Sequence, residues 1–531
     1  KYVQAYFQYD SKKTGGITIS HLRFGDHPIR APYYINKADF VACHNPSYVI
    51  KGYKMVRDVK PGGVFLINCQ WTPEELNEHM PAEAKRYIAK NNIQLYTVNA
   101  IDLAIQIGMG KRTNTILQAA FFALAKVMPI EEAVQYMKDA ATKSYSKKGQ
   151  DVVEMNHKAI DAGVSAFVKI DVPADWATAE DKKDDVKLAG PEKLVTMVKD
   201  IMEPVSKMDG DSLPVSAFVA HADGTFEQGA SAYEKRGVAV MVPEWLPENC
   251  IQCNRCSYVC PHATIRPFAM NADEAAKAPE ATKKAKMTGK GFENYTFTMS
   301  VSPLDCMGCG VCVSVCPAKT KALVMKPRES QEVQQPVFDY MVANVSKKDD
   351  MPAVDTVKGS QFAQPYLEFS GSCAGCAETA YARLITQLFG DRMYVSNATG
   401  CSSIWGGPAA TSPYCTDKKG HGPAWANSLF EDNAEHGLGM LLGQKAVRNR
   451  LIAKVEALAA STDNEAVKAA AEKYLATKDN GKENTPATDA LIAALEACGC
   501  DAAKEILKDK EYLSKKSVWI FGGDGWAYDM G

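Results

Sequence analysis

Two short stretches decide the fold of the middle of the chain: CIQCNRCSYVCP at residues 250–261 and CMGCGVCVSVCP at residues 306–317. Both read C-x2-C-x2-C-x3-C-P. Spacers of two residues let a tight loop aim three sulfurs at one centre, and the final proline turns the chain away. The doubled pattern indicates two metal centres held by thiolates.

This spacing is typical of [4Fe–4S] ligation, in which the fourth cysteine of each run reaches the other cluster. We therefore expect two clusters with crossed ligands. The first set is Cys250, Cys253, Cys256 and Cys316. The second set is Cys260, Cys306, Cys309 and Cys312. Zinc is the alternative, because CxxC pairs also bind zinc, but two zinc sites do not need a doubled quartet followed by prolines.

A third group has only three cysteines: Cys373 and Cys376 in SGSCAGCAET, and Cys401 in NATGCSSIWGG. A cubane cluster needs four ligands. The chain offers three candidates for the fourth, and a cysteine after residue 531 is another. These candidates are Cys415, Cys498 and Cys500. A thioredoxin-type redox pair is the alternative for the first two cysteines, but the βαβ start of that motif is missing.

An apolar, strand-like run at residues 518–521 is followed at once by Gly522-Gly523-Asp524-Gly525. A carboxylate on a glycine turn at the end of a strand suits a Mg2+ ion that bridges a diphosphate, and the glycines let the backbone approach the phosphates. Gly-Asp-Gly also opens the metal motif of thiamine-diphosphate enzymes. By itself the signal is weak, since Asp-Gly is a common turn.

Composition narrows the function classes. The 531 residues correspond to three or four domains, with 46% hydrophobic and 23% charged residues and a formal net charge of −2. No basic block is interleaved with aromatic residues, which argues against nucleic-acid and membrane-surface binding. The most apolar run, at 116–128, is interrupted by Gln118 and Lys126, so we expect no membrane span. Without a secretory signal, the 16 cysteines favour metal ligation in the cytoplasm.

Eight segments in order along the chain resemble the single-chain pyruvate:ferredoxin (flavodoxin) oxidoreductase family. Besides the paired cysteine runs, they are GGITISHLRFG (15–25), FVACHNPSYV (40–49), PVSAFVAHADGTFEQG (214–229), EFSGSCAGCAET (368–379), NATGCSSIWGG (397–407), GPAWANSLFEDNAEHG (422–437) and SVWIFGGDGWAYD (517–529). The resemblance, together with a first residue that is not Met, implies a piece of a polypeptide about twice as long, which works as a homodimer.

The resemblance implies a multidomain α/β fold. Strand-like runs at 17–20, 64–66 and 94–98 alternate with amphipathic helices, and the family binds coenzyme A in this α/β domain. The expected domains are the coenzyme A domain (1–203), a small linking domain (204–245), a ferredoxin-like α+β domain with two [4Fe–4S] clusters (246–330), a polar linker (331–360) and an incomplete thiamine-diphosphate-binding α/β domain (361–531). Within the last domain, about 440–515 reads as a helical excursion.

The implied reaction is the oxidative decarboxylation of pyruvate with coenzyme A in an anaerobe. Electrons would pass through three [4Fe–4S] clusters to ferredoxin or flavodoxin, and thiamine diphosphate with Mg2+ would be bound. By resemblance, Asp524 holds Mg2+, and Gly523, Gly525 and Trp526 form its turn. Gly400, Cys401 and Phe430 line the cofactor pocket, the last two in catalytic positions.

The resemblance also assigns the third cysteine group. Cys373, Cys376 and Cys401 would hold the proximal cluster with a fourth ligand after residue 531, which leaves the three candidate cysteines named above as ordinary thiols.

Coenzyme A contacts are predicted from GMGKRTN at residues 108–114. A Walker loop would need glycine at Ile105 and serine or threonine at Arg112, so ATP is not expected. An arginine flanked by glycines can hold a phosphate through two hydrogen bonds. Arg112 is therefore the leading candidate, with Asn114 and Asn156 behind it; a solvated arginine at a helix start is the alternative.

Two other functions remain open at this stage. A sibling oxidoreductase acting on 2-oxoglutarate or another oxoacid would share the clusters and cofactor but not the substrate pocket. An electron-transfer module without an active site would need only the two runs between 250 and 317. The third cysteine group and the Gly-Asp-Gly turn count against the module.

Overall fold

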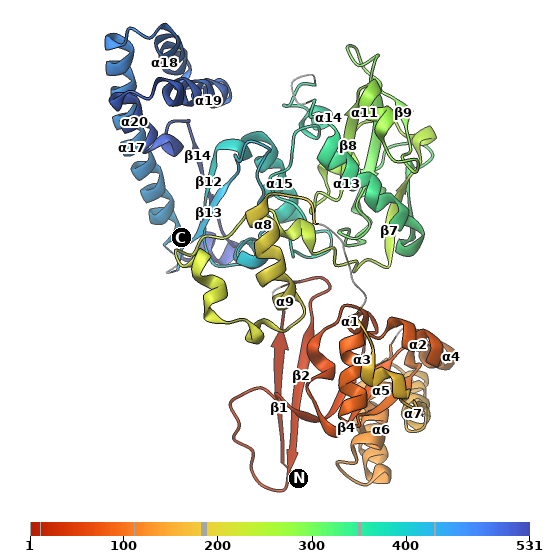
Figure 1. Ribbon diagram of the computed structural model, residues 1–531. Helices are drawn as coiled ribbons and strands as arrows, with labels where there is room; N and C mark the ends of the chain where they lie inside the picture. Colours follow the sequence, from red (N-terminus) through yellow and green to blue (C-terminus); the bar gives the residue numbers. More distant parts are fainter. Residues whose placement is uncertain are drawn as a thin grey trace. The chain divides into compact units, whose positions relative to one another are not determined.

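The structure, a computed structural model, describes residues 2–10, 12–110, 112–181, 188–348, 352–429 and 432–530. The chain divides into two compact units, of which the first holds most of the chain up to Ala220 and the second most of the chain from His221 (Figure 1). No helix in these described ranges is long and apolar enough to cross a membrane.

The first unit is built on a four-stranded sheet in the order β3-β4-β5-β6. The first three strands are parallel and the last is antiparallel. The strands are β3 (Ala38–Cys43), β4 (Val59–Asn68), β5 (Gln94–Val98) and β6 (Phe167–Lys169). A separate two-stranded ribbon is formed by β1 (Tyr2–Tyr9) and β2 (Thr18–Gly25). The strands expected near 17–20, 64–66 and 94–98 are thus present.

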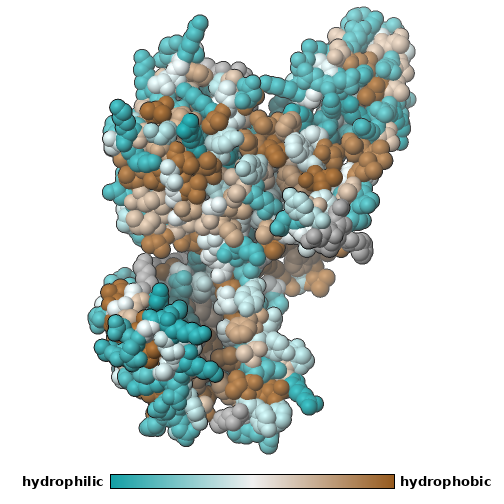
Figure 2. Space-filling view, turned by 180° about the vertical axis from the view of Figure 1, so that it is seen from behind, coloured by the Kyte–Doolittle hydropathy of each residue, from teal (hydrophilic) through white to brown (hydrophobic). Residues whose placement is uncertain are grey.

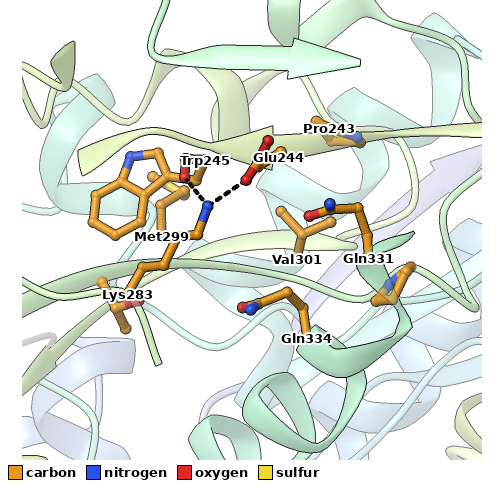
Figure 3. A pocket seen from close by; sticks show the side chains of 10 residues that line it. Pro243, Glu244, Trp245, Lys283, Met299, Val301, Gln331 and Gln334 are labelled. Carbon is orange, nitrogen blue, oxygen red and sulfur yellow. Dashed lines mark hydrogen bonds and ion pairs between the residues drawn. The ribbon is translucent and has the colours of Figure 1, made fainter. Parts of the chain in front are cut away.

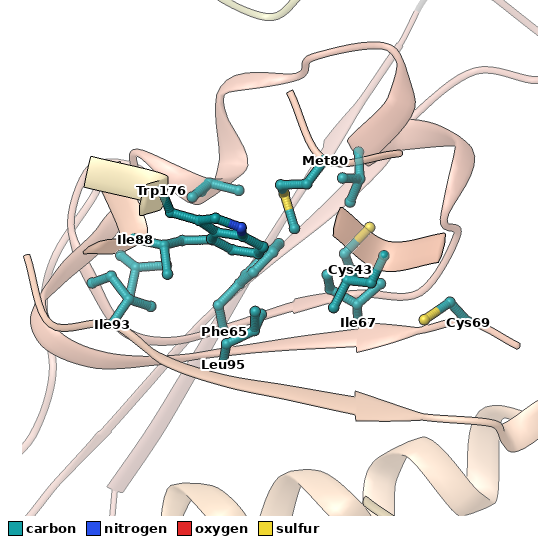
Figure 4. Packing of buried hydrophobic residues seen from close by; sticks show 13 residues of the cluster. Cys43, Phe65, Ile67, Cys69, Met80, Ile88, Ile93, Leu95 and Trp176 are labelled. Carbon is teal, nitrogen blue, oxygen red and sulfur yellow. The ribbon is translucent and has the colours of Figure 1, made fainter. Parts of the chain in front are cut away.

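Helices cover both faces of this sheet because residues of β4 alternate between two cores. Phe65 and Ile67 pack with Trp176 and with α2 (Pro73–His79) and α3 (Ala82–Lys90), as Figure 4 shows. Leu66 points the other way, into a core with the helices that follow β5. Those helices are α4 (Ala100–Ile107), α5 (Asn114–Ala125) and α7 (Gln150–Gly163), with α6 (Ile130–Tyr145) packed behind them.

The cysteine runs of the second unit lie in a small antiparallel α+β part. β7 (Met241–Trp245) pairs with β11 (Leu323–Pro327). β10 (Thr296–Val301) lies between β8 (Ile265–Met270) and β9 (Ala285–Lys286). Each cysteine run contains one short helix, α10 (Arg255–Tyr258) or α12 (Val311–Ser314).

The stretch 331–360 differs from the polar linker expected there. It contains α13 (Gln335–Asn344), whose Val337 and Met341 are buried against Met270 of β8. It also contains α14 (Val357–Ser360). Apolar residues four apart on one helix face explain the difference.

The last part of the second unit has a three-stranded parallel sheet in the order β13-β12-β14. The strands are β12 (Met393–Asn397), β13 (Ala424–Asn427) and β14 (Ser517–Phe521). α15 (Ala377–Phe389) precedes β12 and α16 (Cys401–Gly406) follows it. Short helices in other parts of the chain are α1 (Ser47–Ile50), α8 (Glu192–Met197), α9 (Glu203–Ser206) and α11 (Ala272–Lys277).

The helical excursion expected between β13 and β14 is present as four helices. They are α17 (Asn433–Ser461), α18 (Glu465–Thr477), α19 (Gly481–Cys498) and α20 (Asp501–Leu507). They share a core of their own around Leu451, Tyr474 and Leu491, and the face of these helices seen in Figure 2 is largely hydrophilic.

Candidate metal centres

The two cysteine runs share one backbone conformation. The third residue of each run has a left-handed φ, 54° at Gln252 and 68° at Gly308. The fifth residue does too, with φ of 58° at Asn254 and 73° at Gly310. Two left-handed residues curl each loop before its short helix begins. This backbone conformation explains how cysteines two residues apart can face one centre.

The curled loops direct backbone donors at sulfur. The N–H of Gln252 donates to Sγ of Cys250, and the N–H of Gly308 donates to Sγ of Cys306, each over 3.4 Å. Hydrogen bonds to a thiolate stabilise its charge. The loops are therefore suited to hold anionic sulfur.

One small cavity brings the first crossed set together. It is lined by Cys250, Cys253, Cys256 and Cys316, together with Trp245, Met299 and Leu323. Cys316 belongs to the other run, so the four cysteines that line this cavity are the first set predicted from the spacing. Burial raises the pKa of the Cys256 thiol, and the three other cysteines add to the shift.

The second set is also a neighbourhood of four thiols. Burial raises the pKa of the Cys306 thiol to about 12, and the charges of Cys260 and Cys309 act in the same direction. Burial likewise raises the pKa of Cys312, with contributions from the other three. Four thiolates become compatible with this site only when metal cations neutralise them.

No three His, Cys, Asp or Glu side chains in the described part of the chain are close enough to hold a single metal ion. A [4Fe–4S] cluster holds its cysteine ligands on separate irons. Its ligand sulfurs therefore lie farther apart than those around one ion.

The loop of Cys373 and Cys376 packs directly on the second set. A Cβ atom on Gly375 would lie 3.6 Å from Cβ of Cys309. The buried His262 lies 3.2 Å through Nε2 from the carbonyl oxygen of Cys373. Because His262 follows Cys260 by two residues, the third cysteine group and the second set are joined by contacts on both sides.

Arg383 of α15 is a buried cation that sequence reasoning missed. Its Nε donates to the carbonyl of Cys260 over 2.9 Å, and Nη2 donates to the carbonyl of Tyr258 over 2.6 Å. Nη1 donates to Oε1 of Gln361 and Gln387. Burial lowers the pKa of Arg383 to about 10, which leaves the guanidinium charged at neutral pH. All four acceptors are neutral, and none of them is a carboxylate. The positive charge of Arg383 therefore lies next to the cysteine loop and is not neutralised by these partners.

A second hollow lies beside the first set. Trp245 and Met299 line both hollows, and Figure 3 shows them in the second. Lys283 crosses it to donate to Oε1 of Glu244 over 2.6 Å and to the carbonyl of Trp245 over 3.0 Å. The buried indole Nε1 has no hydrogen-bond partner among the described residues. The ring of Trp245 is thus shared between this hollow and the one lined by the cysteines.

Glycines meet at the carboxyl ends of β12 and β14. Because the two strands are parallel neighbours, Gly400 and the turn at Gly523, Asp524 and Gly525 emerge at the same edge of the sheet. A Cβ atom on Gly400, whose φ is 157°, would lie 3.2 Å from the backbone N of Gly523. The side chain of Asp524 is exposed.

The same edge receives the remaining predicted residues. Cys401 is the first residue of α16 and is exposed. Trp526 follows the glycine turn and is half-buried. Phe430 lies outside the described residues.

A buried polar network beneath this edge was not predicted. Nδ2 of Asn397 donates to Oγ of Ser403 and to Oδ1 of Asn427, each over 2.9 Å. Oδ1 of Asn397 and Oγ of Ser402 are buried and have no partner among the described residues. The only sequence signal was the position of these residues at a strand end, next to Gly400.

The predicted coenzyme A residues lie around the start of α5. Arg112 and Asn114 are exposed. Asn156 is buried in α7, where it accepts from Oγ1 of Thr115 over 3.2 Å and donates to the carbonyl of Val152 over 2.8 Å. The amide of Asn156 is thus engaged between α5 and α7.

The three spare cysteines lie in different surroundings. Cys415 is buried, and its Sγ donates to the carbonyl of Pro365. Cys498 and Cys500 pack at the margin of the core formed by α17 to α20.

Three family models match the chain. Residues 1–166 match "Pyruvate ferredoxin/flavodoxin oxidoreductase", residues 181–239 match a "Domain of unknown function", and residues 249–320 match "4Fe-4S dicluster domain". The last match spans both cysteine runs and supports iron–sulfur clusters rather than zinc in this part of the chain.

Curated relatives match over the full chain. The pyruvate-flavodoxin oxidoreductase of Klebsiella pneumoniae is 49% identical, over 100% of this chain and 45% of the relative. The pyruvate:ferredoxin oxidoreductase of Moorella thermoacetica is 48% identical with the same coverage. The chain spans less than half the length of these relatives. A solved pyruvate oxidoreductase subunit PORC from Thermotoga maritima is 20% identical, with a TM-score of 0.26 over 32% of this chain and 83% of that chain.

Proposed function

The chain belongs to the pyruvate:ferredoxin (flavodoxin) oxidoreductase family, and we propose that the polypeptide containing it oxidises pyruvate with coenzyme A. The products would be acetyl-CoA and CO2, and two electrons would leave on ferredoxin or flavodoxin. The observation that carries this proposal is the contact between the third cysteine group and the dicluster part. The Gly375 side of that group touches Cys309, while its Cys401 starts a helix at the carboxyl edge of a parallel sheet.

The groups at the carboxyl edge of the β12–β14 sheet, a carboxylate and a glycine turn, are of the kinds that bind Mg2+ and a diphosphate, and they therefore fit thiamine diphosphate with Mg2+. When bound, the cofactor supplies the carbanion sink that decarboxylation of a 2-oxoacid requires. Asp524 would hold Mg2+, and Gly523 and Gly525 leave the backbone of the turn open to a diphosphate. The unpaired buried oxygens of Asn397 and Ser402 would gain partners from a polar ligand at this edge.

The cysteines would hold three clusters, which accept and pass on single electrons when present. The two crossed sets hold two of them. Cys373, Cys376 and Cys401 would provide three ligands for the third, and its fourth ligand would come from outside this chain. His262 and Arg383 tie the loop of Cys260 to the segment that carries the third group.

Binding of coenzyme A is proposed at the start of α5. Arg112 and Asn114 are exposed there and can reach a phosphate, whereas Asn156 would act by holding α7 against α5. The family resemblance further leads us to propose a homodimer in the cytoplasm of an anaerobe.

The test uses the complete polypeptide, kept anaerobic with thiamine diphosphate and Mg2+. The visible absorption from thiolate to iron is followed on adding pyruvate and then coenzyme A. We expect bleaching by pyruvate that deepens with coenzyme A and does not occur with 2-oxoglutarate. Bleaching only by another oxoacid would identify a sibling enzyme. Bleaching by dithionite alone would leave an electron-transfer module.

A further inference from the structure

Two cysteines outside every candidate site face each other at the junction of α19 and α20. Cys498 is the last residue of α19, and Cys500 immediately precedes α20. Their Sγ atoms are 2.9 Å apart, within 1 Å of the about 2.05 Å of a disulfide bond. One residue, Gly499, separates them.

The turn that brings the thiols together depends on that glycine. Gly499 has φ of 62° and ends α19 with a hydrogen bond from its N–H to the carbonyl of Leu495 over 3.2 Å. The left-handed turn reverses the chain, so both side chains lie on the same side. The space that a side chain on Gly499 would enter is open, so backbone conformation rather than packing requires glycine here.

The two thiols are chemically unequal. Cys498 donates its S–H to Cys500, which raises the pKa of Cys498 and lowers that of Cys500. The backbone N–H of Ala503 adds to the lowering at Cys500. Both residues are only half-buried. Cys500 is therefore the better nucleophile, with Cys498 held against it.

We propose that Cys498 and Cys500 form a reversible thiol–disulfide site, which small disulfides of the glutathione class oxidise. The thiolate of Cys500 attacks one sulfur of the disulfide, forms a mixed disulfide and releases one thiolate. Cys498 then loses its proton to water, and its sulfur attacks Sγ of Cys500 and releases the second thiolate. The protein loses two protons and two electrons, and the small disulfide becomes two thiols.

The expected bond is labile rather than structural. A disulfide stabilises a fold mainly by closing a long loop, and this loop contains one residue. Strained or exposed disulfides have less negative reduction potentials. The pair is thus suited to respond to the thiol–disulfide balance around the protein, and this inference does not depend on the proposed activity.

The sequence supplies a clean readout. Trypsin cuts after Lys482 and Lys504, and the peptide 483–504 contains Cys498 and Cys500 as its only cysteines. The complete polypeptide is equilibrated anaerobically in glutathione buffers, quenched with acid, alkylated with N-ethylmaleimide and digested. In oxidising buffer we expect this peptide to lose the mass of two hydrogens and to take no label. In reducing buffer it takes two labels.

Two variants separate the roles. In Cys498→Ser, Cys500 should retain bound glutathione, because the resolving thiol is gone. In Cys500→Ser, adduct formation at Cys498 should be slower by roughly tenfold or more, because Cys498 lacks the backbone N–H of Ala503 that helps to stabilise the thiolate of Cys500. Iron–sulfur absorption should be unchanged in both variants. Two labels on the wild-type peptide in every buffer, or loss of cluster absorption in either variant, would overturn the proposal.

Discussion

The two cysteine runs reach one backbone shape by different means. In the first run the left-handed positions are Gln252 and Asn254, whose side chains are tied to neighbouring segments. Gln252 donates to the carbonyl of Lys286 and accepts from the N–H of Thr288, and Asn254 donates to the carbonyl of Lys358. In the second run the same positions are glycines.

The difference shows that the cysteines alone do not hold the loops. Gly308 and Gly310 adopt a left-handed φ without strain but contribute no side-chain contact. Gln252 and Asn254 adopt it at some cost, which their hydrogen bonds offset. The first loop is therefore held by the protein around it. The second loop is instead contacted by the loop of Gly375, which packs on Cys309.

The largest effects should come from breaking the crossed ligation. If the ligands are crossed, Cys316→Ser and Cys253→Ser will change the electron paramagnetic resonance signal of the same cluster. Cys260→Ser will change the other, although Cys260 and Cys253 belong to one run. The measurement is the spectrum of each dithionite-reduced variant. Grouping of Cys260 with Cys253 would show instead that each run holds its own cluster.

Arg383 offers the next largest effect, confined to the cluster held by Cys260. The reduced cluster carries one more negative charge, which the buried guanidinium stabilises. Arg383→Met should therefore shift the potential of that cluster to more negative values in a redox titration followed by paramagnetic resonance. It should also lower stability by about 3 kcal/mol or more, since the carbonyls of Cys260 and Tyr258 lose this donor and the side-chain oxygens of Gln361 and Gln387 each lose one of two donors.

The matched control is Arg383→Lys, which keeps the charge but not the fork of donors. It should destabilise the protein while it retains most of the potential. A potential that stays unchanged in Arg383→Met would show that Arg383 only supports packing.

Sequence patterns predicted what depends on local spacing. The cysteine spacing, the apolar run before Asp524 and the helical period of about 440–515 are all local signals. Four of the cysteines do line one cavity, and the strand and the helices are present, while crossed ligation stays a prediction. Arg383 had no such signal and Asn397 had only its place at a strand end, because their roles come from segments far apart in sequence that meet only after folding. The helix around Met341 was taken for part of a linker because it is a short apolar segment within 331–360, where polar residues are in the majority.

The glycines of the second run allow a test of what each left-handed position requires. A Cβ on Gly308 would lie 2.9 Å from the carbonyl oxygen of Met241, whereas a Cβ on Gly310 would meet nothing within 4 Å. Gly308→Ala should cost about 3 kcal/mol from strain and overlap together, and Gly310→Ala about 1 kcal/mol from strain alone. The measurement is the urea concentration at which iron–sulfur absorption is lost. Equal effects would mean that the loop adapts at Gly308.

The smallest effect is expected at Gln252. It distinguishes the cost of the left-handed backbone from the contribution of the side-chain hydrogen bonds in the first run. Gln252→Ala keeps the left-handed strain and removes all three side-chain hydrogen bonds, one to the carbonyl of Lys286 and two from the N–H and hydroxyl of Thr288, and it should cost about 2 kcal/mol. Gln252→Gly loses the same bonds but relieves the strain, so it should be about 1 kcal/mol less damaging. The same urea titration compares them. If glycine were as damaging as alanine, the left-handed turn in the first run would carry no strain, and the two runs would differ only in their side-chain contacts.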